Sequence, residues 1–135
     1  MSTKNEYMLL FVSNEWYNQL PEAELKQVAA QAKAWLEDLI TRGVAQPGNA
    51  LVRSGVRVTG KTGRIITDGP YPESKEAVGG FVTLKADSLE KAAAIAQGNP
   101  MLQYGMTMEI RQIADVCPLD ARLRELEQEP ATAAA

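Results

Sequence analysis

Residues 6–13 have the sequence EYMLLFVS, which is typical of a β-strand buried on both faces. Successive side chains of a strand point to opposite faces. The apolar side chains therefore fall into two sets, Met8, Leu10 and Val12 on one face and Leu9 and Phe11 on the other. Because both faces are apolar, the sheet that contains this strand needs cover on both sides.

Two helices are predicted from the spacing of apolar residues. The first covers residues 21–42, with Pro21 suited to the first helical position and Gly43 supplying a left-handed stop. The second begins after Asp87, which we expect to be its N-cap, with Glu90 three residues later completing a capping box. Its inner face is predicted to consist of Leu89, Ala92, Ala93 and Ala96, and Gly98 and Pro100 end it.

Further strands are predicted over residues 50–59, 64–68, 78–86 and 105–113, with the two glycines of residues 60–63 making a tight hairpin. In the last strand, one face carries Met106, Met108 and Ile110 and the other carries Thr107, Glu109 and Arg111. A short helix over residues 119–127 and a disordered tail over residues 130–135 complete the predicted chain.

The resulting order, β-α-β-β-(loop)-β-α-β, predicts an α+β fold on the ferredoxin-like βαββαβ plan with an extra hairpin strand. Two helices cover one face of such a sheet, and 135 residues leave nothing to cover the other. A second subunit is therefore expected to supply the cover, and a two-fold homodimer packed sheet to sheet is the simplest closed arrangement.

Composition excludes several classes of function. The chain has no histidine and one cysteine, Cys117, so it cannot build a Ser-His-Asp triad, a Cys-His pair or a cysteine zinc cluster. No metal and no cofactor are therefore expected. The net charge of −3 does not indicate the basic surface that nucleic-acid binding requires. The longest apolar run is too short to span a membrane. A cytoplasmic location is the expectation.

Residues 55–62, GVRVTGKT, match the Walker A pattern of phosphate-binding loops. A phosphate loop requires a helix that begins at its Lys-Thr pair. Here the middle residues alternate as strand formers, and another strand-like run, Arg64-Ile65-Ile66-Thr67, follows. The sequence therefore favours a β-hairpin over a nucleotide site.

The most distinctive stretch is Asp68-Gly69-Pro70-Tyr71-Pro72, followed by Lys75. In a structural interpretation, Asp68 caps a turn that the prolines stiffen, Tyr71 is a packing anchor and Lys75 is a solvated charge. In a functional interpretation, Asp68 is a catalytic acid/base or ligand anchor. Lys75 then tunes its pKa, and Tyr71 supplies a hydroxyl and an apolar wall. Gly69 and Pro70 would belong to the same ligand-binding loop. Separately, Met101, Met106 and Met108 fit a core, a dimer interface or the lining of an apolar pocket.

The motif Asp68-Gly69-Pro70-Tyr71, with Gly79-Gly80-Phe81 after it, resembles the signature of the DGPF group in the YCII-related family. The opening Tyr7-Met8-Leu9-Leu10 and the closing residues 105–113 also resemble that family. The resemblance implies a dimeric α/β-barrel of ferredoxin-like protomers, with a YCII/DGPF-like domain over residues 1–115 and a short helix and tail over residues 116–135. It also implies an acid/base role for Asp68, but this chain lacks the histidine of the family's His-Asp pair.

Two functional hypotheses remain open at this point. In one, the chain is a dimeric small-ligand-binding protein of undefined biochemical role. In the alternative, it is a cofactor-free, lyase-like or isomerase-like enzyme on small molecules that uses Asp68 as acid/base, with Tyr71 and Lys75 placing the substrate.

Overall fold

The computed structural model describes residues 5–13, 15–52, 54–60, 64–67 and 77–128. Its helices, from the N-terminus, are η1 (Trp16–Gln19), α1 (Glu22–Thr41), α2 (Leu89–Ala96), η2 (Pro100–Tyr104) and α3 (Pro118–Gln128), where η denotes a 3-10 helix. Its strands are β1 (Glu6–Ser13), β2 (Ala45–Gln46), β3 (Val56–Thr59), β4 (Arg64–Thr67), β5 (Ala77–Lys85) and β6 (Thr107–Gln112).

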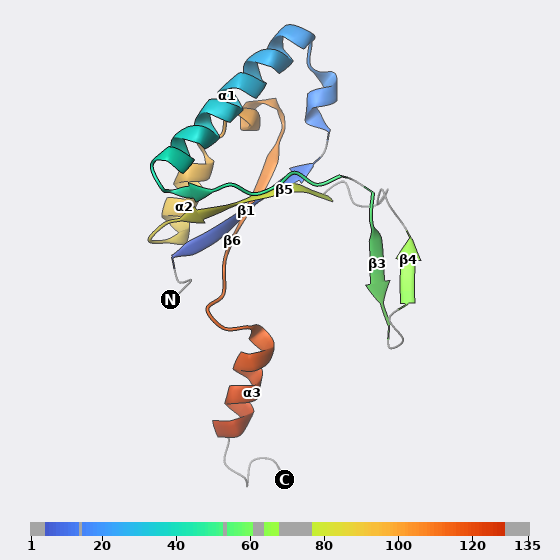
Figure 1. Cartoon of the computed structure of the whole chain (residues 1–135), viewed down its shortest axis with the longest axis vertical. Coiled ribbons are helices and arrows are strands. Elements are labelled where there is room, and N and C mark those ends of the chain that lie inside the picture. The colour runs from blue at the N-terminus through green and yellow to red at the C-terminus, as the bar shows by residue number, and fades with distance from the viewer. Residues whose placement is uncertain (1–4, 14, 53, 61–63, 68–76, 129–135) are drawn as a thin grey trace.

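A four-stranded sheet with the order β2-β5-β1-β6 forms the centre of the molecule, and each neighbouring pair is antiparallel. This is the strand order of the ferredoxin-like βαββαβ plan, so the predicted fold class is confirmed. Helices α1 and α2 lie on one face of the sheet (Figure 1).

The core lies between that face and the two helices. Leu9 of β1 and Leu84 of β5 are fully buried there, and each such burial stabilises the fold by roughly 2 kcal/mol. The other members of the cluster come from both layers: Tyr7, Leu39, Ala45, Val82, Ala92 and Ala96. The alternation predicted for β1 is confirmed on this side, because Tyr7, Leu9 and the partly buried Phe11 all belong to the helix-covered face.

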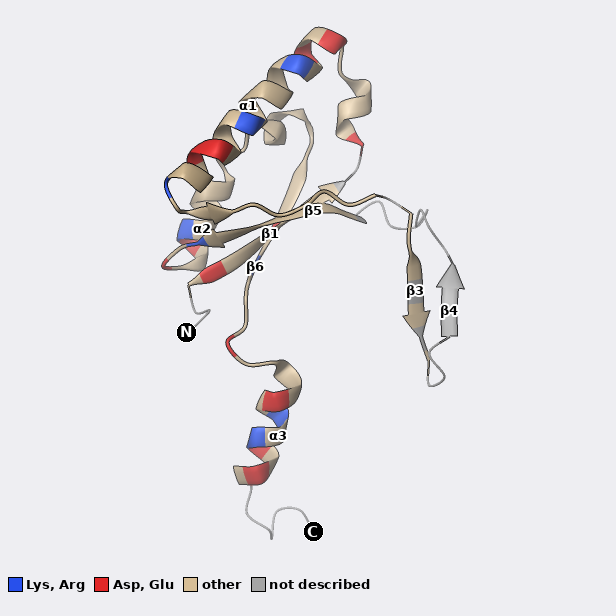
Figure 2. Cartoon of the chain, in the orientation of Figure 1, with Lys and Arg blue, Asp and Glu red and all other residues tan. Residues whose placement is uncertain are grey.

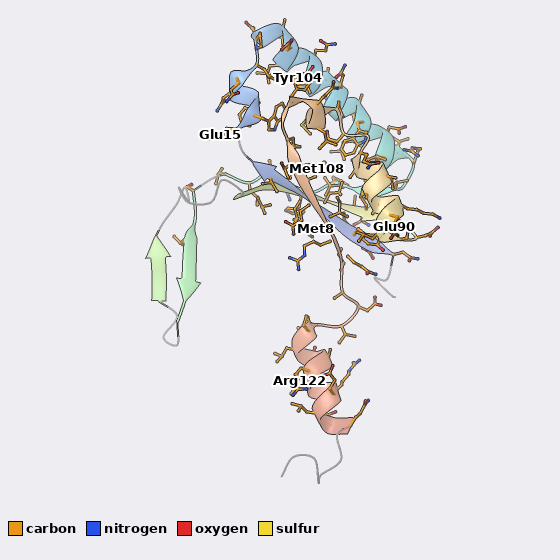
Figure 3. The ribbon with its side chains drawn as sticks, turned by 180° about the vertical axis from the view of Figure 1, so that it is seen from behind. Met8, Glu15, Glu90, Tyr104, Met108 and Arg122 are labelled. Carbon is orange, nitrogen blue, oxygen red and sulfur yellow. The ribbon has the colours of Figure 1, made fainter. Side chains whose placement is uncertain are left out.

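The opposite face of the sheet carries Met8 and Leu10, which remain only half-buried. Leu10 is paired in register with Phe81 on one side and Glu109 on the other. No helix of the described chain covers this face (Figure 1). Figure 3 shows Met108 on the helix side of β1 and Met8 on the other side.

The predicted strand over residues 50–59 was wrong in its extent. Its first part is not a regular strand: Ala50 makes an isolated bridge to Gly80, and the sheet is completed earlier in the chain by the short β2. Its second part, β3, pairs only with β4 and forms a separate two-stranded sheet that projects from the body (Figure 1). The extra hairpin therefore has two strands of its own rather than adding one to the main sheet.

That hairpin also answers the question of the Walker A pattern. Residues 56–59 and 64–67 are paired strands, whereas a phosphate loop would have placed the start of a helix after Thr62. The interpretation as a β-hairpin is confirmed.

The predicted N-cap of the second helix was wrong by one residue. Ser88 is the N-cap of α2, and its hydroxyl accepts a hydrogen bond from the backbone N–H of Lys91 at 3.1 Å. Asp87 instead forms an exposed ion pair with the ammonium of Lys91, at 3.2 Å. Because the helix begins one residue later, Leu89 is half-exposed, and the inner face of α2 is built from Ala92 and Ala96.

Helix α3 confirms the short helix predicted near the C-terminus, but none of its residues is buried. Its apolar residues Leu119, Leu123 and Leu126 lie on one helical face and are about half-exposed or more. Figure 1 shows α3 extending away from the sheet. The predicted tail over residues 130–135 lies outside the described residues. No helix in the described part of the chain is long and apolar enough to cross a membrane.

Candidate functional site: an apolar cavity at one end of the sheet

Two adjoining cavities of about 330 Å³ and 280 Å³ lie where β1 ends and β5 begins. They share the lining residues Phe11, Ala50, Gly79, Met101 and Met106. The first also reaches Val12, Trp16, Tyr17 and Leu51, and the second reaches Leu36, Pro47, Gly48, Asn49, Gly80, Phe81 and Val82. We refer to the pair as the apolar cavity, because none of these lining residues is Asp, Glu, Lys or Arg.

One wall of the apolar cavity is the segment between β2 and β3. Asn49 accepts a hydrogen bond from the backbone N–H of Phe81 at 3.1 Å, and Leu51 donates one to Gly79 at 2.9 Å. This segment lies close to β5, because a Cβ added to Gly80 would stand 3.1 Å from the carbonyl oxygen of Asn49. Glycine at position 80 therefore lets this segment lie against β5.

A second wall is aromatic and comes from η1. The indole of Trp16 stacks on the ring of Tyr104 in η2, with ring centroids 6.3 Å apart. It also forms a T-shaped pair with Tyr17, with ring centroids 5.7 Å apart. Such pairs stabilise by about 0.5–1.5 kcal/mol beyond their burial. This stack ties η1 to η2, and both elements contribute residues to the lining of the apolar cavity.

The remaining wall consists of two methionines positioned around Asn99, which is 3% exposed. Its carbonyl oxygen caps η2 by accepting the backbone N–H of Met101 at 3.0 Å. Its amide nitrogen donates to the sulfur of Met106 at 3.4 Å and to the sulfur of Met108 at 3.0 Å. Thioether sulfur is a weak acceptor, so this buried amide has its donors satisfied only weakly.

The chemistry that this site offers is recognition of apolar surface. Figure 2 shows no charged residue along η2, in contrast to the outer side of α1. Among the described residues, no group of three or more His, Cys, Asp or Glu could hold a metal ion. The described lining therefore supplies shape, aromatic faces and sulfur rather than acid/base groups.

A larger groove of about 630 Å³ lies at the opposite end of β1 and β5. Its charged lining residues are Glu6, Lys85, Asp87 and Lys91, so the lining carries two cations and two carboxylates. Asp87 and Lys91 pair with each other at 3.2 Å and are both exposed. We find no chemistry in this groove that selects a ligand, and we take the apolar cavity as the candidate site.

The site residues predicted from the sequence, Asp68, Gly69, Pro70, Tyr71 and Lys75, all lie outside the described residues. The described chain fixes only what borders them: β4 ends at Thr67, immediately before Asp68, and β5 begins at Ala77. Two residues further on, Gly79 lines the apolar cavity. The predicted motif thus joins the hairpin to the strand on which the cavity is built.

Of the three methionines singled out in the sequence, Met101 and Met106 line the apolar cavity, whereas Met108 packs against the core. Sequence reasoning missed Asn99 and Trp16. The sequence did contain a signal for Asn99, because an Asn before Pro100 is a strong candidate for a helix N-cap. The sequence contained no signal for the hydrogen bonds from the Asn99 amide to the sulfurs of Met106 and Met108.

A family model described as the YCII-related domain matches residues 6–116. The chain therefore belongs to the YCII-related family, and the resemblance seen in the sequence is confirmed. Among curated proteins, none matches this sequence.

Among solved structures, the chain is similar to a 5-chloro-2-hydroxyhydroquinone dehydrochlorinase from Burkholderia phenoliruptrix, determined in complex with 2,5-dihydroxybenzoquinone. The identity is 16%, the TM-score is 0.47, and the match covers 80% of this chain and 91% of the other.

Proposed function

We propose that this chain is a homodimeric protein of the DGPF group that binds a small molecule in the apolar cavity. In this proposal the segment around Asp68 and Tyr71 completes the site, with Gly69 and Pro70 shaping the loop and Lys75 near the ligand. The proposal includes a cytoplasmic location, with which an exposed, unpaired Cys117 is compatible.

The observation that carries the proposal is the apolar cavity itself. Ligand sites are mostly concave and apolar, with volumes of roughly 300–1,000 Å³, and the two adjoining spaces of about 330 and 280 Å³ together fall within that range. The cavity is built on β5, the strand that directly follows the motif in the sequence.

The proposed dimer is supported by the uncovered sheet face. Met8 and Leu10 are half-buried there, although no helix of the described chain lies over them. A sheet face whose apolar side chains are only partly covered is a candidate interaction surface, and a two-fold axis lets the same face of a second copy cover this one.

A thermal-shift screen of metabolites tests the proposal. A ligand at 100 times its Kd stabilises the folded chain by about 2.7 kcal/mol, which corresponds to a rise in Tm on the order of 8 °C. Ala50 lines both parts of the cavity and is exposed, so Ala50→Phe fills space without disturbing the core. The matched control is Ala34→Phe on the exposed side of α1.

We expect the Tm rise given by any hit to disappear in Ala50→Phe and to persist in Ala34→Phe. A screen without hits, or hits that stabilise both variants equally, contradicts the proposal.

The second candidate is a cofactor-free, lyase-like or isomerase-like enzyme in which Asp68 moves a proton. Its support comes from the sequence: Asp68 precedes β5, and β5 carries Gly79 of the cavity lining. With a hit in hand, Asp68→Asn separates the two candidates. Loss of product formation with retained binding supports the enzyme, whereas a lowered Tm alone supports a structural role for Asp68.

A further inference from the structure

Helix α3 carries a row of leucines that the described part of the chain leaves exposed. Leu119, Leu123 and Leu126 are 67%, 50% and 45% exposed, and no residue of α3 is buried. The helix points away from the sheet and from the two helices packed on it (Figure 1). We call these three leucines the α3 seam. A continuous apolar row on an exposed helix is a candidate interaction surface.

The width of the α3 seam indicates what it meets. Its leucines follow one another after four and then three residues, which is the d-a-d spacing of a heptad repeat. A helix that packs on a sheet or a globular core has a wider apolar stripe, which also takes in the e or g positions. In α3 those positions are charged, with Asp120 and Glu127 at e and Arg122 at g. The α3 seam therefore fits a second helix better than a sheet face.

The charges beside the α3 seam fit a second copy of the same helix in parallel orientation. In a parallel pair, a g residue lies beside the e residue five positions later in the other helix, which places Arg122 beside Glu127 of the second copy. In an antiparallel pair, g meets g and e meets e, so Arg122 would meet Arg122 and Glu127 would meet Asp120. Within the chain, Arg122 contacts Glu125 at 3.1 Å, and this pair is exposed, so a carboxylate of a second copy can approach it.

The connection between β6 and α3 is long enough for this pairing. It consists of residues 113–117, and five residues span at most about 17 Å. Paired helices lie about 8–10 Å apart, and sheets packed face to face lie about 10 Å apart. Two α3 helices that leave the proposed sheet-to-sheet dimer at the same end can therefore meet along its two-fold axis.

From these observations we propose that α3 is a dimerisation helix, which pairs in parallel with α3 of a second copy through Leu119, Leu123 and Leu126. The proposal rests on the homodimer of the proposed function and adds a second contact to it. Isolated helices below about 12–15 residues are marginal, and α3 has 11. The helix pair therefore strengthens a dimer that the sheets hold together, because the sheet contact raises the effective concentration of one α3 near the other.

Disulfide trapping tests the direction of the pair. A parallel pair sets residue 126 against residue 126 of the second copy, whereas an antiparallel pair sets d positions against a positions. In a Cys117→Ser background, we expect Leu126→Cys to give a covalent dimer under mild oxidation. Arg124→Cys, on the outer side of the same turn, is the matched control and should give none.

Sedimentation equilibrium over a dilution series measures how much the pair contributes. Leu123→Gln should raise the dissociation constant of the dimer at least ten-fold, whereas the outer-side control Arg124→Gln should leave it unchanged. Because no residue of α3 is buried, these variants leave the packed core intact.

A charge exchange tests the pairing across the seam. Arg122→Glu sets two carboxylates beside each other and should raise the dissociation constant about five-fold. Adding Glu127→Arg should bring it back to within two-fold of wild type, although the contact of residue 122 with Glu125 stays broken. Failure of this rescue overturns the parallel orientation.

The remaining outcomes separate this inference from the proposed dimer. A dimer whose dissociation constant is unchanged by Leu123→Gln overturns the helix pair and leaves the sheet-to-sheet dimer standing. Weakening by Leu123→Gln without a crosslink through Leu126→Cys shows that α3 lies on another surface of the second copy, and it also overturns the helix pair. A wild-type chain that sediments as a monomer throughout the dilution series overturns both.

Discussion

The side-chain amide of Asn99 donates a hydrogen bond to the sulfur of Met108 over 3.0 Å. Asn99 precedes η2 in the helical layer, and Met108 lies in β6, so this bond joins the two layers of the fold beside the apolar cavity. Because Asn99 is buried, each of its donors that loses an acceptor costs free energy.

Met108→Leu preserves apolar volume but removes the sulfur acceptor. We expect it to lower the free energy of unfolding by about 1–2 kcal/mol, since a buried N–H of Asn99 is left without its nearer partner. Urea denaturation followed by circular dichroism measures this. Met8→Leu on the open sheet face is the matched control and should stay within about 0.5 kcal/mol of wild type. Equal stability of the two variants would show that the sulfur contact contributes nothing.

Ser88→Ala should destabilise the chain by about 1 kcal/mol, because it removes the hydroxyl that caps the first turn of α2. Asp87→Ala, which would remove a capping oxygen if Asp87 were the N-cap, should change stability by less than about 0.5 kcal/mol, because its ion pair with Lys91 is exposed. The two variants, compared in urea, distinguish the cap seen in the structure from the one expected at Asp87. The reverse order of effects would restore Asp87 as the cap.

Gly48→Ala should be far more damaging than its size suggests. A Cβ at this position would stand 1.7 Å from the carbonyl oxygen of Phe81, so the segment between β2 and β3 must move away from β5. We expect the free energy of unfolding to fall by about 3 kcal/mol, at the upper end of the range for overpacked substitutions. Gly43→Ala meets nothing within 4 Å and carries only the strain of its positive φ, so it should cost about 1–2 kcal/mol. Thermal unfolding of the two variants gives the comparison, and a Gly48→Ala protein as stable as Gly43→Ala contradicts the close approach.

Leu10→Arg tests the proposed dimer. Leu10 lies between Phe81 and Glu109 on the uncovered sheet face, where a guanidinium can remain hydrated in a monomer but not inside a sheet-to-sheet interface. Light scattering should give twice the 14.7 kDa chain mass for wild type and the chain mass for the variant. Ala34→Arg on the exposed side of α1 should leave the mass unchanged. A wild-type particle of 14.7 kDa at micromolar concentration would exclude the dimer.

Much of the architecture could be predicted because it follows from local patterns. The alternation in residues 6–13 and the apolar stripe of α1 each specify an element, and their order specifies the ferredoxin-like plan. The errors arose where a tertiary contact decided the outcome. The two-residue β2 is too short to show a period, and it is a strand only because Ala45 and Gln46 pair with β5. Asp and Ser are both good N-cap residues, and the position at which the first turn of α2 begins makes Ser88 rather than Asp87 the cap.

The candidate site was less predictable for the same reason. Its lining comes from β1, η1, α1, the segment before β3, β5, η2 and the segment after η2, so no short motif encodes it. Asp68 and Tyr71 could be proposed from the sequence because they lie together in one motif. Asn99, by contrast, acquires its role only when η2 is folded against β6.

Calorimetric titration of a screening hit tests the apolar cavity most directly. We expect one site per chain and a negative heat-capacity change, because binding in this cavity buries apolar surface. We also expect the hit to bind Ala50→Phe at least ten-fold more weakly than wild type. Binding with no heat-capacity change and with equal affinity for Ala50→Phe would place the ligand elsewhere and contradict the assignment of this cavity.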